Sequence, residues 1–177
     1  TKLVDWKNKY YPNAFFHMNH VPSQSWDHYL PRDGEIFDYE DFLTEYVNVI
    51  LKRLNGCGRS LCLDNYPFIG ENYIEKDYLY DLMTAAKVTR AYNAQAKPED
   101  RAIFGICLQT FAAKSMFDDR RRDIKMPEEV TLQMYTGMAC GAQLQSVDHP
   151  HHSPHSPEAH PQDGSRSDAP DIRSCRF

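Results

Sequence analysis

Apolar residues recur with helical spacing in the middle of the chain. From Ile103 they follow the i, i+3, i+4, i+7, i+8 order that places one broad apolar face along a helix. Pro98 has the fixed φ of a first helical turn, and Glu99 and Asp100 suit the positive end of its dipole. The pattern predicts a helix over 98–117. Its inward positions are Ile103, Phe104, Cys107, Leu108, Phe111, Ala112, Ser115 and Met116.

Three further helices follow from similar patterns. Asp38 can cap a helix over 39–54, which Asn55 and Gly56 would end with a left-handed turn. A second amphipathic pattern covers 75–95, and a third runs over 128–143 after the start signal of Pro127. The intervals 12–36 and 56–73 contain prolines and glycines and are predicted to be loops, and no alternating run supports a strand. The expected fold is mainly α, a domain of about four to five helices over 1–145 with long aromatic-rich loops.

The composition changes after Gln145. Residues 146–177 hold five of the eight histidines and five of the eleven prolines, and Phe177 is their only aromatic residue. Such a segment cannot bury enough apolar area to offset an ordering entropy of about 1 to 2 kcal/mol per residue. We predict a disordered tail rich in His, Pro and Ser.

Charge and cysteine content exclude several classes of protein. A net charge of -5 argues against a nucleic-acid binder, because phosphate contacts need a concentrated basic surface. No apolar stretch approaches the roughly 20 residues of a membrane-spanning helix, so no membrane span is expected. Five cysteines and no Asn-x-Ser/Thr sequon do not fit a secreted disulfide framework. We expect a reducing compartment, the cytoplasm with its cytoskeleton or the nucleus.

One acidic segment has the spacing of a calcium-binding loop. Such a loop needs a glycine for its sharp turn, an apolar residue two positions later and an acid four beyond that, and Gly34, Ile36 and Glu40 have this spacing. The segment resembles an EF-hand. The first and third positions of a standard loop fall on Tyr29 and Pro31, which carry no carboxylate.

A longer loop from Asp27 to Glu40 resembles the variant in which backbone carbonyls replace missing ligands. This resemblance implies calcium ligation by Asp27, Asp33 and a bidentate Glu40. A second half over 70–79 would be empty, because Asn72 replaces the glycine and Tyr78 the gripping acid. The resemblance, to a degenerate EF-hand pair, covers about 25–96. The alternative interpretation is two ordinary capped helices that follow acidic turns.

Other chemical patterns are weaker. Cys57 and Cys62 lack the second pair that a zinc site needs, and are expected to be unpaired thiols. An aspartate-rich segment is similar to the magnesium motif of terpene cyclases, although three adjacent arginines would oppose metal loading. No nucleophile elbow, His-Glu-x-x-His or Walker motif occurs. The remaining candidate ligands are His17, His20 and His28, and Asp118, Asp119 and Asp123.

Aromatic residues in the predicted loops suggest a docking surface, since aromatic side chains dominate interface hot spots. The same residues could instead pin the loops to the core. We hypothesise a non-enzymatic protein-interaction module, a scaffold or regulatory subunit. The alternatives are a calcium-responsive sensor and a helical metal-dependent enzyme that uses Asp118, Asp119 and Asp123. The interaction residues would be Trp6, Tyr10, Tyr11, Phe15, Phe16, Trp26, Tyr29, Tyr66 and Phe68.

Overall fold

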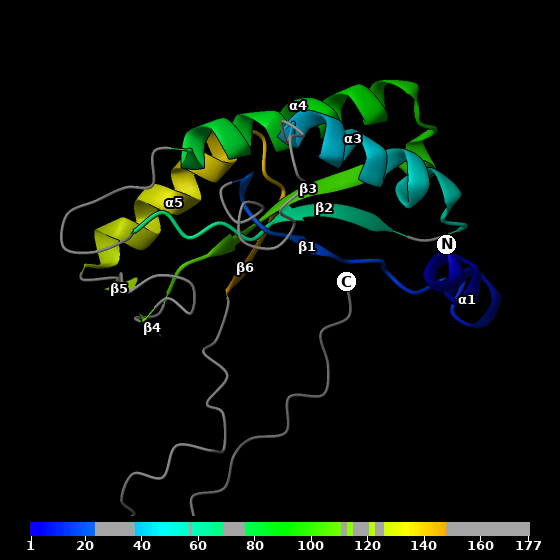
Figure 1. The fold of residues 1–177 in the computed structure, drawn as a ribbon, viewed down its shortest axis with the longest axis horizontal. Coiled ribbons are helices and arrows are strands. Elements are labelled where there is room, and N and C mark those ends of the chain that lie inside the picture. Colours follow the sequence, from blue (N-terminus) through cyan, green and yellow to red (C-terminus); the bar gives the residue numbers. More distant parts are fainter. Residues whose placement is uncertain are drawn as a thin grey trace, which may run out of the picture.

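A computed structural model describes residues 1–23, 38–56, 58–68, 77–110, 113–114, 121–122 and 126–147. Helices and parallel strands alternate along most of this part of the chain (Figure 1). The elements are α1 (Lys2–Tyr10), β1 (Asn19–His20), α3 (Tyr39–Val49), η2 (Leu51–Arg53), β2 (Arg59–Leu63), α4 (Tyr78–Gln95), η3 (Pro98–Asp100), β3 (Ala102–Leu108), β4 (Ala113–Lys114), β5 (Arg121–Arg122), α5 (Pro127–Ala139) and β6 (Leu144–Val147).

The main sheet has four parallel strands in the order β1-β2-β3-β6. Its register places Asn19 beside Cys62, Cys62 beside Gly105 and Gly105 beside Leu144. Each strand therefore pairs with the strand of this sheet that precedes it along the chain. β4 and β5 form a separate antiparallel pair.

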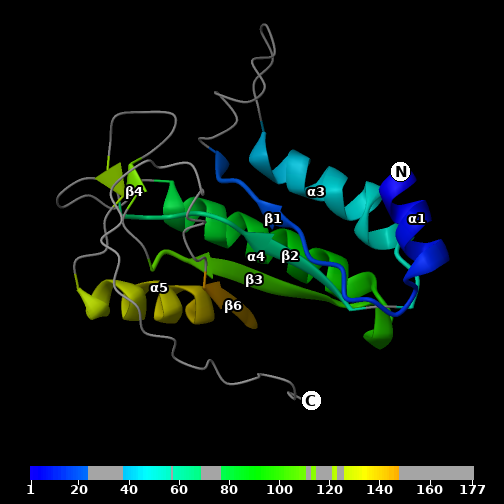
Figure 2. The same ribbon diagram turned by 90° about the horizontal axis from the view of Figure 1, so that it is seen from below.

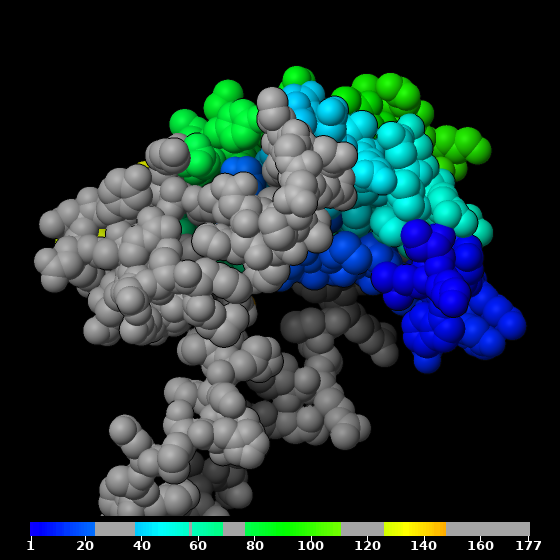
Figure 3. Space-filling view, in the orientation of Figure 1, coloured from blue at the N-terminus to red at the C-terminus, as the bar shows by residue number. Residues whose placement is uncertain are grey.

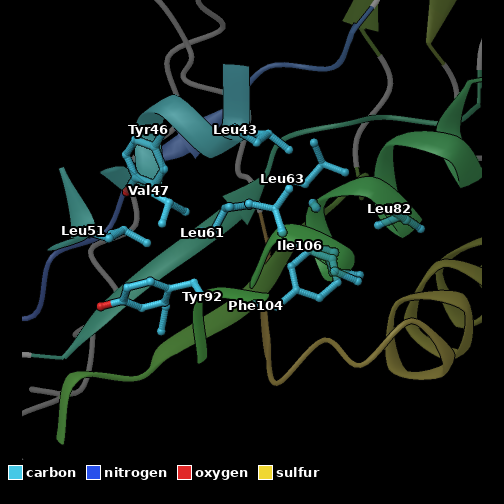
Figure 4. Close-up of a cluster of buried hydrophobic side chains, with 14 of the residues drawn as sticks. Leu43, Tyr46, Val47, Leu51, Leu61, Leu63, Leu82, Tyr92, Phe104 and Ile106 are labelled. Atoms are coloured by element: carbon cyan, nitrogen blue, oxygen red, sulfur yellow. The ribbon is translucent and has the colours of Figure 1, made fainter. Parts of the chain in front are cut away.

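The helices α3, α4 and α5 cover one face of this sheet, as two perpendicular views show (Figures 1 and 2). Alternate residues of the strands point toward them and form the core. Figure 4 shows this layer, in which side chains from the strands meet side chains from α3, η2 and α4. Its labelled members are Leu43, Tyr46, Val47, Leu51, Leu61, Leu63, Leu82, Tyr92, Phe104 and Ile106.

The prediction of a mainly α fold is wrong, and the error lies chiefly at 98–117. The chain forms a short 3-10 turn at Pro98–Asp100 and then the strand β3, of which every residue but Ile103 is buried. A strand covered on both faces has a continuous apolar run, and spacing alone cannot distinguish such a run from a buried helix. The fold is α/β.

Other strands lie where loops were expected. β1 falls within the interval 12–36, and β2 within 56–73. All five residues of β2 are buried, including the polar Arg59 and Ser60, so the alternation that indicates a half-exposed strand is absent. β6 spans the predicted boundary between 145 and 146, while residues 148–177 lie outside the described part of the chain.

The helices that follow clear start signals are confirmed. α3 begins after Asp38, whose carboxylate accepts the Asp41 amide at 3.1 Å, and Gly56 has a left-handed φ of 59°. α4 and α5 occupy most of 75–95 and 128–143. The N-terminal helix α1 was not predicted. It packs through Val4 and Lys7, whose ammonium group donates to the Asn55 carbonyl at 3.0 Å.

Candidate functional site

The carboxyl ends of the parallel strands meet at one edge of the sheet, which we call the carboxyl edge. The described residues that follow the strands directly there are 21–23, 64–68 and 109–110. Ligands of parallel α/β sheets bind at this edge, because the loops there can vary without disturbing the packed layers. α1 bonds to residues 53–55, which precede β2, and so lies near the opposite edge.

A buried carboxylate connects two of these loops. Asp81, on α4, is fully buried, and its Oδ2 accepts the Ser23 amide at 3.1 Å and the Asn65 side-chain amide at 3.0 Å. Charge-assisted hydrogen bonds of this kind stabilise a carboxylate that has left water. Asp81 therefore fixes the chain after β1 and after β2 relative to α4.

Two buried glutamines hold the end of β3. Gln109 donates its backbone amide to Oε1 of Gln133, on α5, at 2.8 Å, and Gln133 returns a bond to the Gln109 carbonyl at 3.0 Å. The Gln109 side chain pairs with the backbone amide and carbonyl of Phe68 at 3.0 and 3.1 Å. Reciprocal hydrogen bonds thus join the loop after β2, the end of β3 and α5, and these bonds hold the carboxyl edge rigid.

Asp64 carries the half-buried carboxylate of this edge. Its backbone amide donates to the His20 carbonyl at 2.8 Å, which extends the pairing of β1 and β2 by one residue. Strand alternation places Asp64 on the same face as Cys62, opposite the helices. Tyr66 is also half-buried, and Thr110 is exposed at the end of β3. A carboxylate whose Oδ1 is buried, a phenol and a hydroxyl therefore lie at the carboxyl edge.

His20 faces the helices instead. Its ring packs edge-on against Tyr46 with centroids 4.1 Å apart, and its Nε2 is buried without a hydrogen-bond partner. Burial, with a smaller effect from His17, lowers the pKa of His20 from 6.5 to about 4. The imidazole is neutral near pH 7, because the apolar surroundings disfavour its charged form.

Two thiols meet on the face opposite the helices. Sγ of Cys62 lies 3.8 Å from Sγ of Cys107, and the Ser146 hydroxyl donates to Cys107 at 3.2 Å. The hydrogen bond with Cys107 and burial raise the pKa of Cys62, so its thiol stays protonated. A protonated thiol is a poor nucleophile and a poor metal ligand.

The predicted metal ligands do not come together in the described part of the chain, where no group of three His, Cys, Asp or Glu side chains is arranged to hold an ion. Glu40 lies in the first turn of α3 and forms an ion pair with Lys87 of α4 at 2.7 Å. The His17 ring is hydrogen-bonded to the Ser60 hydroxyl at 3.0 Å, whereas His20 lies on the face of the sheet that the helices cover. Tyr78 is buried as the first residue of α4. The predicted site residues outside the described ranges are Asp27, Asp33, His28, Cys57, Asp118, Asp119 and Asp123.

The predicted interaction residues separate into two groups. Trp6, Tyr10, Tyr11 and Phe15 are each about half exposed, and Figure 3 shows α1 standing out at one end of the molecule. The Trp6 ring lies 5.0 Å from that of Tyr11 and 6.0 Å from that of Tyr10. We call these four residues the α1 aromatic cluster.

The other predicted interaction residues are less exposed than this cluster or lie outside the described residues. Phe16 and Phe68 are buried, which corrects their placement on a docking surface. Phe16 continues the pairing beside β2, where its amide donates to the Gly58 carbonyl at 2.8 Å, and so its side chain enters the core. Tyr66 is half-buried, and Trp26 and Tyr29 lie outside the described residues.

Sequence reasoning missed the residues of the carboxyl edge. The one signal was the order of residues at 61–65, where three buried residues, Leu61, Cys62 and Leu63, precede Asp64 and Asn65. Polar residues that follow a buried strand are typical of a carboxyl edge. This signal was lost because the surrounding interval was interpreted as a loop.

No protein-family model, curated protein or solved structure matches this chain. Among the residues that the structure describes, no helix combines the length and the apolar character that crossing a membrane requires.

Proposed function

We propose that this protein binds an uncharged, polyhydroxylated small molecule of carbohydrate type at the carboxyl edge, as part of an enzyme. The observation that carries the proposal is the position of Asp64, a half-buried carboxylate directly after β2. The loops around it are held in place by the hydrogen bonds of Asp81, Gln109 and Gln133. Rigid surrounding loops keep a ligand-binding group in one geometry and so lower the entropy lost on binding.

The side chains that follow the strands directly suit hydroxyl ligands. No described residue in 21–23, 64–68 or 109–110 is a lysine or an arginine, the side chains that bind phosphate and carboxylate groups. The basic residues described after β3, Lys114, Arg121 and Arg122, lie further along the chain in β4 and β5. Carboxylates accept hydrogen bonds from hydroxyl groups, and phenols and hydroxyls both donate and accept them. Asp64, Tyr66 and Thr110 supply these three groups, and the Tyr66 ring can also lie against the apolar face of a sugar.

In a reaction, Asp64 is the group that would accept a proton from a substrate hydroxyl or from water. Hydrolysis of a glycosidic bond requires a second carboxyl group beside the first. Asp81 does not fill that role, because it is buried and its Oδ2 is occupied by Ser23 and Asn65. A reaction of this type therefore needs a further acid at the same edge.

The test is a ligand screen on the full chain, with neutral mono- and oligosaccharides as probes and saturation-transfer NMR as the readout. We expect one class of sugar to bind wild-type protein and Asp64→Asn to weaken this binding at least tenfold, since charged hydrogen bonds contribute about 1.5 to 3 kcal/mol. The control is Glu99→Gln, an exposed acid in η3 at the opposite edge. Equal binding by Asp64→Asn and wild type would refute the role of Asp64.

The α1 aromatic cluster favours a second function, protein binding. Exposed tryptophan and tyrosine side chains give large contact areas for little loss of side-chain entropy. All four members are 48% to 56% exposed, and Lys9 adds a cation 4.9 Å from the Tyr10 ring. We propose a protein partner at this end of the molecule, away from the carboxyl edge.

This second function is tested by affinity purification followed by reconstitution with the purified partner. Trp6→Ser combined with Tyr11→Ser is expected to abolish the complex, while Tyr135→Ser, an exposed aromatic on α5, leaves it intact. A complex that survives the double substitution would exclude the cluster as the binding surface.

A further inference from the structure

A hollow of about 470 Å³ lies at the edge of the sheet opposite the carboxyl edge, where the chain enters β2 and β3. Three buried residues, Leu54, Arg59 and Tyr92, form its floor. Two exposed lysines, Lys52 and Lys97, line it nearer to solvent. We call this hollow the lysine pocket. Its volume is typical of small-molecule sites, which measure roughly 300 to 1,000 Å³.

Hydrogen bonds fix the floor of the lysine pocket. Arg59 donates to the Tyr92 hydroxyl at 3.0 Å and to the Leu54 carbonyl at 3.1 Å, and it forms an ion pair with Asp100 at 2.9 Å. The Tyr92 hydroxyl in turn donates to the Asp100 carbonyl at 2.7 Å. A ligand that enters therefore meets a surface that is already ordered, which lowers the entropy lost on binding.

The two lysines give the pocket a positive charge, although the full chain carries a net charge of -5. Asp100 neutralises Arg59, and α4 ends beside the pocket at Gln95, where the helix dipole contributes only about half a negative charge. Among the described residues, no carboxylate forms an ion pair with Lys52 or Lys97. Two ammonium groups that share one pocket repel each other, and a doubly negative group bound between them would remove this repulsion.

A smaller hollow of about 150 Å³ continues the lysine pocket between α3 and α4. Both hollows are lined by Lys52, Tyr92 and Gln95. The smaller one also has the exposed polar side chains of Thr44 and Asn48. Amides and hydroxyls both donate and accept hydrogen bonds, so these side chains suit the hydroxyl groups of a ligand. The two hollows together fit an anionic group joined to a hydroxylated body.

We propose that the lysine pocket binds a small sugar phosphate. Lys52 and Lys97 hold the phosphate group, because lysine ammonium groups bind phosphate as point charges. Asn48 and Gln95 bond to the hydroxyl groups of the sugar. The site lies at the opposite edge of the sheet from Asp64, and none of its lining residues belongs to the α1 aromatic cluster, so it goes beyond both functions proposed above.

The experiment is calorimetric titration of the full chain with glycerol 3-phosphate, ribose 5-phosphate and glucose 6-phosphate. Ionic strength is held constant, because salt screens the lysine charges. Inorganic phosphate and the three unphosphorylated compounds are the comparison ligands. We expect at least one sugar phosphate to bind at least tenfold more tightly than inorganic phosphate and than its own unphosphorylated form. If none does, the proposal is refuted, and binding of inorganic phosphate to the same extent would indicate an adventitious ion only.

Substitutions then locate the bound phosphate. Lys52→Gln combined with Lys97→Gln is expected to weaken binding at least tenfold. The matched control, Lys2→Gln combined with Lys9→Gln, removes the same charge from exposed positions on α1 outside the pocket and should bind like the wild type. Equal losses in both double variants would show attraction to net charge alone and would overturn the proposal. Melting temperatures verify that all variants are folded.

Two further variants separate this site from the carboxyl edge. Asn48→Ala should reduce the preference for the sugar phosphate over inorganic phosphate, a change that a loss of folding would not produce. Asp64→Asn should bind the sugar phosphate like the wild type, because Asp64 lies at the other edge of the sheet. Loss of this binding in Asp64→Asn would place the ligand at the carboxyl edge and overturn the proposal. A chain that binds sugar phosphates but no neutral sugar would refute only the proposed function.

Discussion

At the scale of single residues, the layer between the sheet and α3 contains a titratable group that lacks a compensating partner. His20 is buried against Tyr46 and Phe42, and no hydrogen bond reaches its Nε2. A neutral imidazole is tolerated there because its ring packs like an aromatic side chain. The charged form would have to be desolvated, which makes the stability of the fold dependent on pH.

We predict that the protein loses stability as the pH falls from about 6.5 toward 4. The folded-state pKa of His20 is about 4, below its unfolded value of 6.5, so the unfolded chain binds the proton more tightly. The stabilisation is complete above pH 6.5 and declines by about 3 kcal/mol in total as the pH falls through this range. Denaturant unfolding at a series of pH values measures the decline.

The variant His20→Phe removes the titrating group and keeps a ring between Tyr46 and Phe42. We expect its stability to change less than that of the wild type between pH 6.5 and 4. Tyr46→Phe serves as the control, because it leaves His20 in place and should keep the pH dependence. Identical profiles for His20→Phe and wild type would show that another group causes the decline.

At the scale of elements, α5 approaches β3 more closely than a helix with ordinary side chains could. Gly137 faces Ile106, and a Cβ atom built there would overlap Cδ1 of Ile106. The structure shows that the neighbour is a side chain of the buried strand, so this glycine sets the distance between the helix layer and the sheet.

We predict that Gly137→Ala destabilises the protein by about 1 to 2 kcal/mol, although alanine is the better helix former by about 1 kcal/mol. The reason is overpacking against Ile106. Urea unfolding of Gly137→Ala, of Ile106→Val and of the double variant measures the effect. Ile106→Val removes Cδ1, so the double variant should be more stable than the sum of the two single changes implies. Simple additivity would indicate that the strain lies elsewhere.

At the scale of the whole molecule, one buried cation joins elements that are distant in the sequence. Arg59, at the start of β2, donates to the Leu51 carbonyl at 2.9 Å, the Leu54 carbonyl at 3.1 Å and the Tyr92 hydroxyl at 3.0 Å. It also forms an ion pair with Asp100 at 2.9 Å. These bonds connect the sheet with η2, α4 and η3 near the edge opposite the carboxyl edge.

We predict that Arg59→Lys lowers the free energy of unfolding by about 3 kcal/mol or more, because one ammonium group cannot replace the planar guanidinium at four acceptors. Thermal and urea unfolding measure the loss. Arg101→Lys, a change of the same chemistry at an exposed position, is the control and should alter stability by less than about 0.5 kcal/mol. Similar losses in both variants would contradict the central role of Arg59.

The sequence by itself determined the elements that local signals specify. Asp38 marks the start of α3 through its side-chain bond to the helix, and the left-handed Gly56 follows the turn after η2. Pro127 opens α5, where Glu129 bonds back to the Met126 amide. These signals act within a few residues, so they can be recognised without knowledge of distant contacts.

Only the tertiary structure decided the strands and the candidate site. β2 and β3 are each buried on both faces, which removes the alternation that would have indicated a strand, and only their pairing in the parallel sheet distinguishes them from buried helices. Asp64, Asp81, Gln109 and Gln133 meet only because the parallel strands end at one edge. Their separation along the chain carries no spacing that a sequence motif could record, and so the site depends on the fold.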